Sequence, residues 1–195
     1  MRPALPFVDY QQPSAPGGVV IVGEAPGAEE VRQGKPFVGR SGKLLDENLH
    51  AAGIERNQCL VANVFRYQPP GNKVGHFFAS RRKAAATGLK LAEKWGPFGT
   101  SDYCLAEYAG ELDHLAATLR KLKPRVVIAL GRTPLWALTG LSGIVKLRGQ
   151  FVPCRLAEGV QIMPTYHPSY ILRGRWEDVP VWRGDLAAAL ALSRS

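Results

Sequence analysis

Cysteine is scarce in this sequence: its 195 residues include only Cys59, Cys104 and Cys154, with no short spacing among them. Small disulfide-held domains carry more cysteines at closer spacings, so the pattern argues against a disulfide framework. No apolar run approaches the ~20 residues that cross a bilayer, and the start of the chain lacks the apolar centre of a secretory signal. We therefore expect a cytoplasmic protein without a membrane anchor. Residues 1–17 are predicted to form a proline-rich, loosely ordered leader.

Acidic residues are also few, because 25 Lys and Arg stand against 16 Asp and Glu and give a net charge of +9. Such an excess favours a polyanionic partner such as nucleic acid. The alternative is a charge that keeps the protein soluble and serves no partner. The 46% of apolar and 21% of charged residues are ordinary for a soluble protein. This length fits a single domain over residues 1–195, which we expect to be a monomer.

The most informative stretch covers residues 19–45. Its apolar, β-branched start at Val19–Val22 is typical of a strand buried on both faces. The run breaks at Gly23 and continues into a glycine-rich loop that carries Glu24 and the lone aromatic Phe37. In open α/β sheets ligands bind at the carboxyl ends of the strands, so this loop is predicted to form a site.

A phosphate-binding loop is the main alternative for the same stretch. Its pattern, G-x-x-x-x-G-K-[ST], is not met, because Arg40 follows Gly39 and Leu44 follows Lys43. The dinucleotide-binding pattern G-x-G-x-x-G is not met either. We therefore expect the loop to serve a different ligand.

Three more apolar runs, at residues 59–65, 125–130 and 160–163, predict further strands. Helical patterns alternate with them, with Ser41 and Thr133 as candidate caps for two of the helices. This alternation predicts an α/β fold, a three-layer α/β/α sandwich around a short parallel four-stranded sheet. A further short strand is expected at residues 150–153.

The segment from residue 67 to 102 is the least regular part of the chain. It combines a basic run with aromatic residues: Arg81, Arg82, Lys83, Phe77, Phe78, Trp95 and Phe98. Cations can contact phosphates and aromatic rings can stack on bases, which suits a nucleic-acid surface. The alternative is a surface excursion whose aromatic side chains pack back onto the core. The sequence leaves both interpretations open.

Three motifs, taken in order, resemble those of the uracil-DNA glycosylase superfamily and most closely its family 4. They are GEAPG at 23–27 with Glu30 and GKPFVG at 34–39, NVFRYQPPGN at 63–72, and PTYHPSYILR at 164–173. The resemblance covers most of the chain. It implies a DNA repair enzyme that flips uracil out of DNA and hydrolyses its N-glycosidic bond, leaving an abasic site.

The resemblance assigns the base to a small set of residues. Phe37 would stack on uracil, and the Asn63 carboxamide would pair with O4 and N3–H at once. Gly23 and Ala25 would lie beside the bound nucleotide, with Gly23 letting the sugar approach. The alternatives are a core phenylalanine for Phe37 and a turn-forming residue for Asn63.

Two catalytic residues are expected. His167 would donate a hydrogen bond to the uracil O2 as negative charge grows there. Glu24 would stabilise the sugar cation and orient or deprotonate the attacking water. Glu29 and Glu30 are competitors, but their place at a helix start explains an acid without catalysis.

The resemblance also implies contacts with the DNA strand. Ser169 would hold its loop against a phosphate, and Arg173 would contact another. Ile171, or Tyr170, would be the wedge that fills the space left by the flipped base. Arg81, Arg82 and Lys83 are candidates for further phosphate contacts.

The chain departs from family 4 in its cysteines. Members of that family hold a four-iron cluster on four cysteines; here only Cys104 matches, Tyr67 occupies another ligand position, and residues 1–18 contain none. Since one thiolate cannot hold such a cluster, we expect no metal and no cofactor. A branch of the superfamily that bonds covalently to the abasic site carries a basic loop ending in histidine. No histidine follows Lys83, so we expect a monofunctional hydrolase.

Other functions remain possible from the sequence. The chain could be a catalytically silent DNA-binding relative, or a glycosylase for another deaminated base such as hypoxanthine. The joint presence of Glu24, Phe37, Asn63 and His167 favours an active enzyme.

Overall fold

The computed structural model describes residues 5–14 and 19–195. Its strands are β1 Val20–Gly23, β2 Leu60–Asn63, β3 Phe78–Ser80, β4 Asp102–Cys104, β5 Val126–Leu130, β6 Val152–Pro153 and β7 Gln161–Thr165. Its α-helices are α1 Ala28–Gln33, α2 Gly39–Ala51, α3 Arg81–Thr87, α4 Ala109–Leu122, α5 Arg132–Thr139, α6 Ile144–Leu147, α7 Pro168–Leu172 and α8 Val179–Arg194. Single 3-10 turns lie at Arg56–Gln58, Pro70–Asn72, Val74–Phe77, Glu93–Trp95, Ala106–Tyr108 and Trp176–Asp178.

The main sheet has the order β2-β1-β5-β7-β6. Four strands are parallel, as predicted, and their register pairs Gly23 with Asn63 at the carboxyl end of β1 and β2. The short strand expected at residues 150–153 is also present as β6, which pairs antiparallel with β7 and makes the sheet five-stranded. The carboxyl ends of β1, β2, β5 and β7 therefore meet along one edge.

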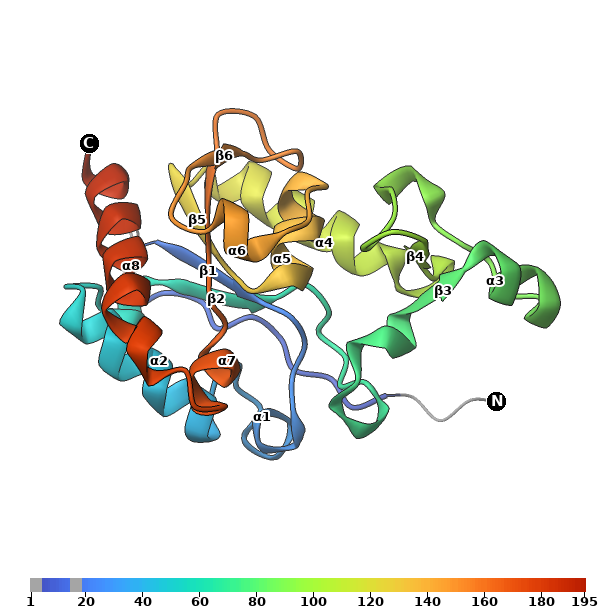
Figure 1. Cartoon of the computed structure of the whole chain (residues 1–195), viewed down its shortest axis with the longest axis horizontal. Coiled ribbons are helices and arrows are strands. Elements are labelled where there is room, and N and C mark those ends of the chain that lie inside the picture. The colour runs from blue at the N-terminus through green and yellow to red at the C-terminus, as the bar shows by residue number, and fades with distance from the viewer. Residues whose placement is uncertain (1–4, 15–18) are drawn as a thin grey trace.

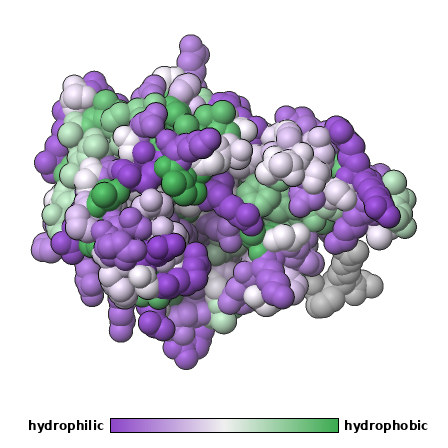
Figure 2. Space-filling view, in the orientation of Figure 1, coloured by the Kyte–Doolittle hydropathy of each residue, from purple (hydrophilic) through white to green (hydrophobic). Residues whose placement is uncertain are grey.

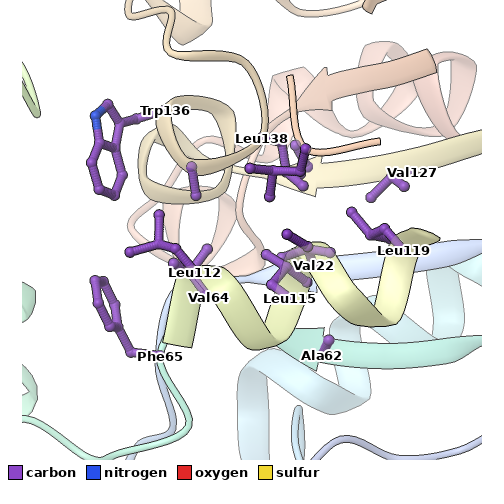
Figure 3. Packing of buried hydrophobic residues seen from close by; sticks show 14 of the residues in the cluster. Val22, Ala62, Val64, Phe65, Leu112, Leu115, Leu119, Val127, Trp136 and Leu138 are labelled. Atoms are coloured by element: carbon purple, nitrogen blue, oxygen red, sulfur yellow. The ribbon is translucent and has the colours of Figure 1, made fainter. Parts of the chain in front are cut away.

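Helices cover both faces of the sheet, which confirms the three-layer sandwich (Figure 1). On one face, Leu112, Leu115 and Leu119 of α4 and the buried residues of α5 pack on the alternate strand residues Val22 and Val127 (Figure 3). On the other face, α2, α7 and α8 pack on the opposite set of strand residues. Alternation of side chains along each strand supplies both faces.

The segment between β2 and α4 forms a second unit around the two-stranded sheet β3-β4, which projects to one side of the molecule in Figure 1. Phe77 stacks on Phe65 with ring centroids 4.3 Å apart, and Phe78 stacks on Phe98 at the same distance. Phe78 also meets Trp136 of α5 edge-on at 5.2 Å. Of the two interpretations of these aromatics, packing back onto the core is the one observed.

Residues 5–14 are not a loose leader, which corrects that prediction for the described part. Val8 and Tyr10 are buried. Gln11 forms an antiparallel bridge with Val61 on β2, and the Val8 N–H donates to the Arg66 carbonyl at 2.8 Å. The proline-rich composition hid a segment that pairs with the main sheet.

Two helix starts also differ from expectation. Val38 and Gly131 are the capping residues of α2 and α5, so Ser41 and Thr133 lie inside these helices. A short polar side chain near a helix start predicts a cap. Here Ser41 instead lines the neighbouring cavity, and Thr133 donates to Glu24, which also lines it. Among the described residues no helix is long and apolar enough to cross a membrane.

Candidate active site

A cavity of about 390 Å3 lies at the carboxyl edge of the sheet, a size typical of small-molecule sites. It brings together most of the residues that the sequence singled out. Its lining is Glu24, Ala25, Gly27, Glu30, Phe37, Ser41, Asn63, Asn72, His167, Ser169 and Arg173. The three motifs therefore meet in one place.

Gly23 lies beneath the aromatic and amide groups of this cavity. A Cβ at Gly23 would lie 2.3 Å from Phe37 Cζ and 2.6 Å from Asn63 Oδ1. Both distances are far below van der Waals contact, so only glycine lets the ring and the carboxamide meet here. Two side chains of the protein thus approach Gly23 closely, and the approach of a sugar at this position stays a prediction.

The Phe37 loop is held in a constrained shape. Phe37 itself has a φ of 51°, in the left-handed region that non-glycine residues rarely adopt. Arg56 donates to the carbonyls of Pro36 and Phe37 at 2.7 and 3.0 Å, and to Asp46 Oδ1 at 2.6 Å. A Cβ at Gly42 would lie 2.0 Å from the Phe37 carbonyl oxygen. These contacts fix the loop from below and leave the ring at the cavity.

Glu24 is held by a residue far along the chain. The Thr133 hydroxyl, fully buried in the first turn of α5, donates a hydrogen bond to Glu24 Oε2. This bond fixes one carboxylate oxygen and leaves Oε1 as the candidate to face a water or a sugar.

The two competing acids have local roles. Glu30 Oε2 accepts from the Gly27 N–H at 3.0 Å and caps α1. Glu29 pairs with Arg32 at 2.5 Å, and hydrogen bonds from Gln33 and Arg32 lower the pKa of its carboxyl. These contacts give Glu29 a structural role on α1, and it does not line the cavity. Glu30 both caps the helix and lines the cavity.

His167 caps the short helix α7 with its own side chain. Its Nδ1 accepts from the Ser169 N–H at 3.1 Å, and Ser169 Oγ lies 2.8 Å from the same nitrogen. Burial, with a smaller effect from the nearby Arg173 cation, lowers the pKa of His167 to about 4. At neutral pH the ring is uncharged, and because Nδ1 accepts, Nε2 carries the proton. The Phe37 and His167 ring centroids are 5.7 Å apart, so a neutral donor lies beside the aromatic face.

Some predicted site residues are not brought to this cavity. Ile171 lies on the inner side of α7 and is fully buried in the core, so the wedge role expected of it disagrees with its position. The apolar stripe of a short helix placed it inward. Arg81 pairs with Glu93 at 2.8 Å, while Arg82 and Lys83 are exposed on α3 in the projecting unit (Figure 1).

Sequence patterns missed two supporting residues, Thr133 and Arg56. Thr133 is 109 residues from Glu24, and Arg56 is 19 from Phe37. Neither belongs to a recognisable motif. The only signal in the sequence was that each is a polar residue close to one of the apolar runs. Their contacts exist only once the sheet has aligned its carboxyl edge.

A four-iron cluster does not fit the residues present. Cys104 is fully buried, its thiol contacts the Leu105 carbonyl, and burial raises its pKa to about 12, which disfavours the thiolate that iron requires. The Tyr67 ring packs edge-on against Phe7 at 5.4 Å. Within residues 5–14 and 19–195, no three His, Cys, Asp or Glu residues are grouped as metal ligands would be.

Comparison with known protein families identifies the class to which this fold and this cavity belong. The model of the uracil DNA glycosylase superfamily matches residues 10–187, so the chain belongs to this superfamily.

Proteins named Type-4 uracil-DNA glycosylase are similar over most of the chain. The one from Thermotoga maritima is 35% identical over 159 residues, which cover 80% of this chain and 67% of that protein. The one from Pyrobaculum aerophilum is 32% identical over 200 residues, 96% of this chain and 85% of that protein. A third, from Archaeoglobus fulgidus, is 29% identical over 160 residues, 79% and 66%.

Proposed function

We propose that this protein is a monofunctional uracil-DNA glycosylase that acts in base excision repair. The observation that carries the proposal is the convergence of Phe37, Asn63, His167 and Glu24 on one cavity. Each side chain supplies a different requirement of base removal. The similarity of the chain to proteins named Type-4 uracil-DNA glycosylase supports uracil in DNA as the substrate.

The base-binding part of the mechanism follows from Phe37 and Asn63. A uracil flipped from the helix stacks on the Phe37 ring, which the constrained loop presents. The Asn63 carboxamide, 4% exposed, offers both a donor and an acceptor to O4 and N3–H of uracil. Since the missing side chain of Gly23 leaves room for both the amide and the ring, stacking and pairing act on the same base.

Bond cleavage follows from His167 and Glu24. As the glycosidic bond breaks, electrons move onto the base, and the His167 Nε2–H stabilises the charge that grows on O2. A neutral ring donates that hydrogen bond without transferring its proton. The sugar left behind has cationic character, which the Glu24 carboxylate stabilises while it orients the attacking water. Water then adds at C1′ and releases its proton, giving an abasic site and free uracil.

Contacts with the DNA strand complete the proposal. Ser169 and Arg173, which line the cavity, contact the phosphates on either side of the flipped nucleotide, and Arg82 and Lys83 on α3 stay a prediction for more distant phosphates, whereas Arg81 is paired with Glu93. The protein is proposed to act as a cytoplasmic monomer without a cofactor.

The test is an oligonucleotide with a single uracil, incubated with the protein and then treated with alkali. We expect alkali-labile breaks at the uracil, no break before alkali, and no reaction with thymine in its place. Hypoxanthine and xanthine oligonucleotides run in parallel measure the base range. Binding to uracil DNA without alkali-labile sites would identify a DNA-binding protein without glycosylase activity. Breaks only at hypoxanthine would mean that the substrate is hypoxanthine and not uracil.

A further inference from the structure

Val145 on α6 is an exposed apolar side chain, with 70% of its surface accessible. It is the most exposed of the large apolar residues in the described chain. Gly143, with a φ of 93°, turns the chain into α6 immediately before it. Figure 2 shows apolar surface at the place of α6, enclosed by hydrophilic surface and next to a hollow.

Two hollows meet at Val145. One is lined by Glu24 and His167 together with Ile144, Val145 and Arg173. The other runs toward the projecting unit and contains Phe98. Ile144, Val145 and Arg132 line both hollows, so the tip of α6 stands between them. A strand whose flipped nucleotide occupies the catalytic cavity would pass this tip.

The charges around the tip suit a nucleic-acid strand. Arg132 is exposed, with its guanidinium 4.9 Å from the centre of the Phe98 ring. Lys146 follows Val145 directly and lines the second hollow, and Arg173 lines the first hollow with Val145. An apolar side chain amid cations matches DNA, where bases lie between phosphates.

The tip is firmly mounted. Arg148, just after α6, donates to both carboxylate oxygens of Asp185 on α8, at 2.7 and 3.0 Å. Asp185 also accepts from the Thr165 hydroxyl at 2.6 Å, at the end of β7 and two residues before His167. The Gly149 N–H donates to the Pro164 carbonyl at 3.0 Å. The same strand therefore fixes both the tip and the catalytic histidine.

The neighbouring helix α7 does not offer an equivalent side chain. Ile171 is fully buried, and the Tyr170 ring stacks on Tyr166 at 4.5 Å while its hydroxyl donates to Asp178 at 2.9 Å. Both would have to leave the core or an existing pair of contacts before entering a base stack. Val145 has no such cost.

We propose that Val145 is the wedge of this enzyme: it enters the base stack beside the flipped nucleotide, so that α6 and not α7 holds the helix open. The inference rests on the proposed glycosylase function and extends it to the recognition of duplex DNA. A wedge offsets the cost of unstacking, which is a few kcal/mol in a paired duplex and is largely absent in a single strand.

The experiment compares single-turnover uracil excision from a U·A duplex and from the same strand unpaired. Val145→Ala is expected to slow excision from the duplex by ~10-fold, within the few kcal/mol that unstacking costs, and from the single strand by less than ~2-fold. Val145→Leu should retain the wild-type ratio. Val181→Ala, a matched truncation of an exposed valine on α8 outside both hollows, should change neither rate.

A second measurement separates the wedge from the chemistry. In a duplex with 2-aminopurine next to an abasic-site analogue, binding of the wild type should raise the fluorescence, and Val145→Ala should lose this rise. This result requires no uracil excision, so it stands even if the proposed function fails. Equal effects of Val145→Ala on both strands, no effect on either readout, or a wild type that acts only on single strands would each overturn the proposal. Trp176, another exposed large apolar residue with 54% of its surface accessible, is the competing candidate, and a duplex-specific loss in Trp176→Ala with none in Val145→Ala would overturn the proposal as well.

Discussion

In the cavity at the carboxyl edge of the sheet, one polar atom of a side chain is hydrogen-bonded within the protein and another remains available to a ligand. In the projecting unit between β2 and α4, comparable side chains contact one another instead. The His167 Nδ1 is engaged by Ser169 and its Nε2 remains as a donor, whereas Arg81 is paired with Glu93 and its guanidinium lies 4.6 Å from the centre of the Tyr103 ring. Residue type alone does not distinguish these uses. What distinguishes them is whether contacts within the protein occupy every polar group of the side chain or leave one of them available.

The largest effect expected on the cavity side of this comparison is that of Glu24→Gln. We expect single-turnover uracil excision to fall by roughly 10² or more, the scale of general-base assistance, with affinity for abasic DNA little changed. Glu29→Gln is the control, because Glu29 is engaged by Arg32 outside the cavity. If Glu30→Gln were inactive and Glu24→Gln nearly normal, Glu30 would be the catalytic acid.

A smaller loss is expected from Gly23→Ala. Its new methyl group would overlap the Phe37 ring and the Asn63 amide, and overpacking of this kind costs ~1–3 kcal/mol of folding stability. Displacement of the ring and the amide should also slow excision roughly 10-fold, which corresponds to ~1.4 kcal/mol of lost transition-state stabilisation. Thermal unfolding and single-turnover rates measure the two consequences. Gly110→Ala, on α4 where the new methyl group would meet no side chain or distant backbone within 4 Å, should leave excision unchanged and should not destabilise the fold. Normal excision by Gly23→Ala would mean that the ring and the amide need not meet.

The pH dependence tests the bracing of His167. Because the pKa of His167 is lowered to about 4, excision should show no inflection from this group between pH 8 and 5 and should fall as the pH approaches 4. Removing the nearby cation with Arg173→Met should raise that midpoint. Single-turnover rates at saturating enzyme provide the measurement, and a midpoint at the ordinary histidine value of 6.5 would contradict a neutral donor held by burial.

The same shift predicts a stability change. Between about pH 6.5 and 4 the unfolded chain binds the His167 proton and the folded chain does not, so the contribution of this group to stability falls as the pH falls through this window.

The smallest effect concerns phosphate contacts. If Arg173 meets a phosphate, Arg173→Met should reduce the salt slope of DNA binding by about 0.9. Arg81→Met should leave the slope unchanged, because Glu93 already neutralises Arg81. Titrations of abasic DNA at several salt concentrations measure both. The double variant Arg82→Met, Lys83→Met tests the exposed part of the run, and an equal slope in all variants would mean that none of these cations contacts DNA.

The sequence predicted what is local and periodic. The β-branched runs gave the four parallel strands, and the loops after β1 and β7 were expected at one edge because parallel strands end together. Contacts made across the chain were not predictable. Thr133 resembles a cap in the sequence because Pro134, which suits the first turn of a helix, follows it, and only the packing of α5 on β1 turns its hydroxyl to Glu24. The burial of Ile171 was unpredictable for a different reason, since a five-residue helix gives too little periodicity to show which face is buried.

The bridge between Gln11 and Val61 has a consequence for association between copies of the protein. β2 is the last parallel strand of the sheet, and an open outer edge would be a template for strands of other molecules. Gln11 donates to and accepts from Val61 at 2.9 and 3.0 Å, while Val8 and Gln68 continue the pairing beyond the strand. The opposite edge is closed by the two residues of β6, a length too short to recruit another strand. The early segment thus protects a repair enzyme from aggregation through its sheet edge, a role separate from anything it contributes to the cavity.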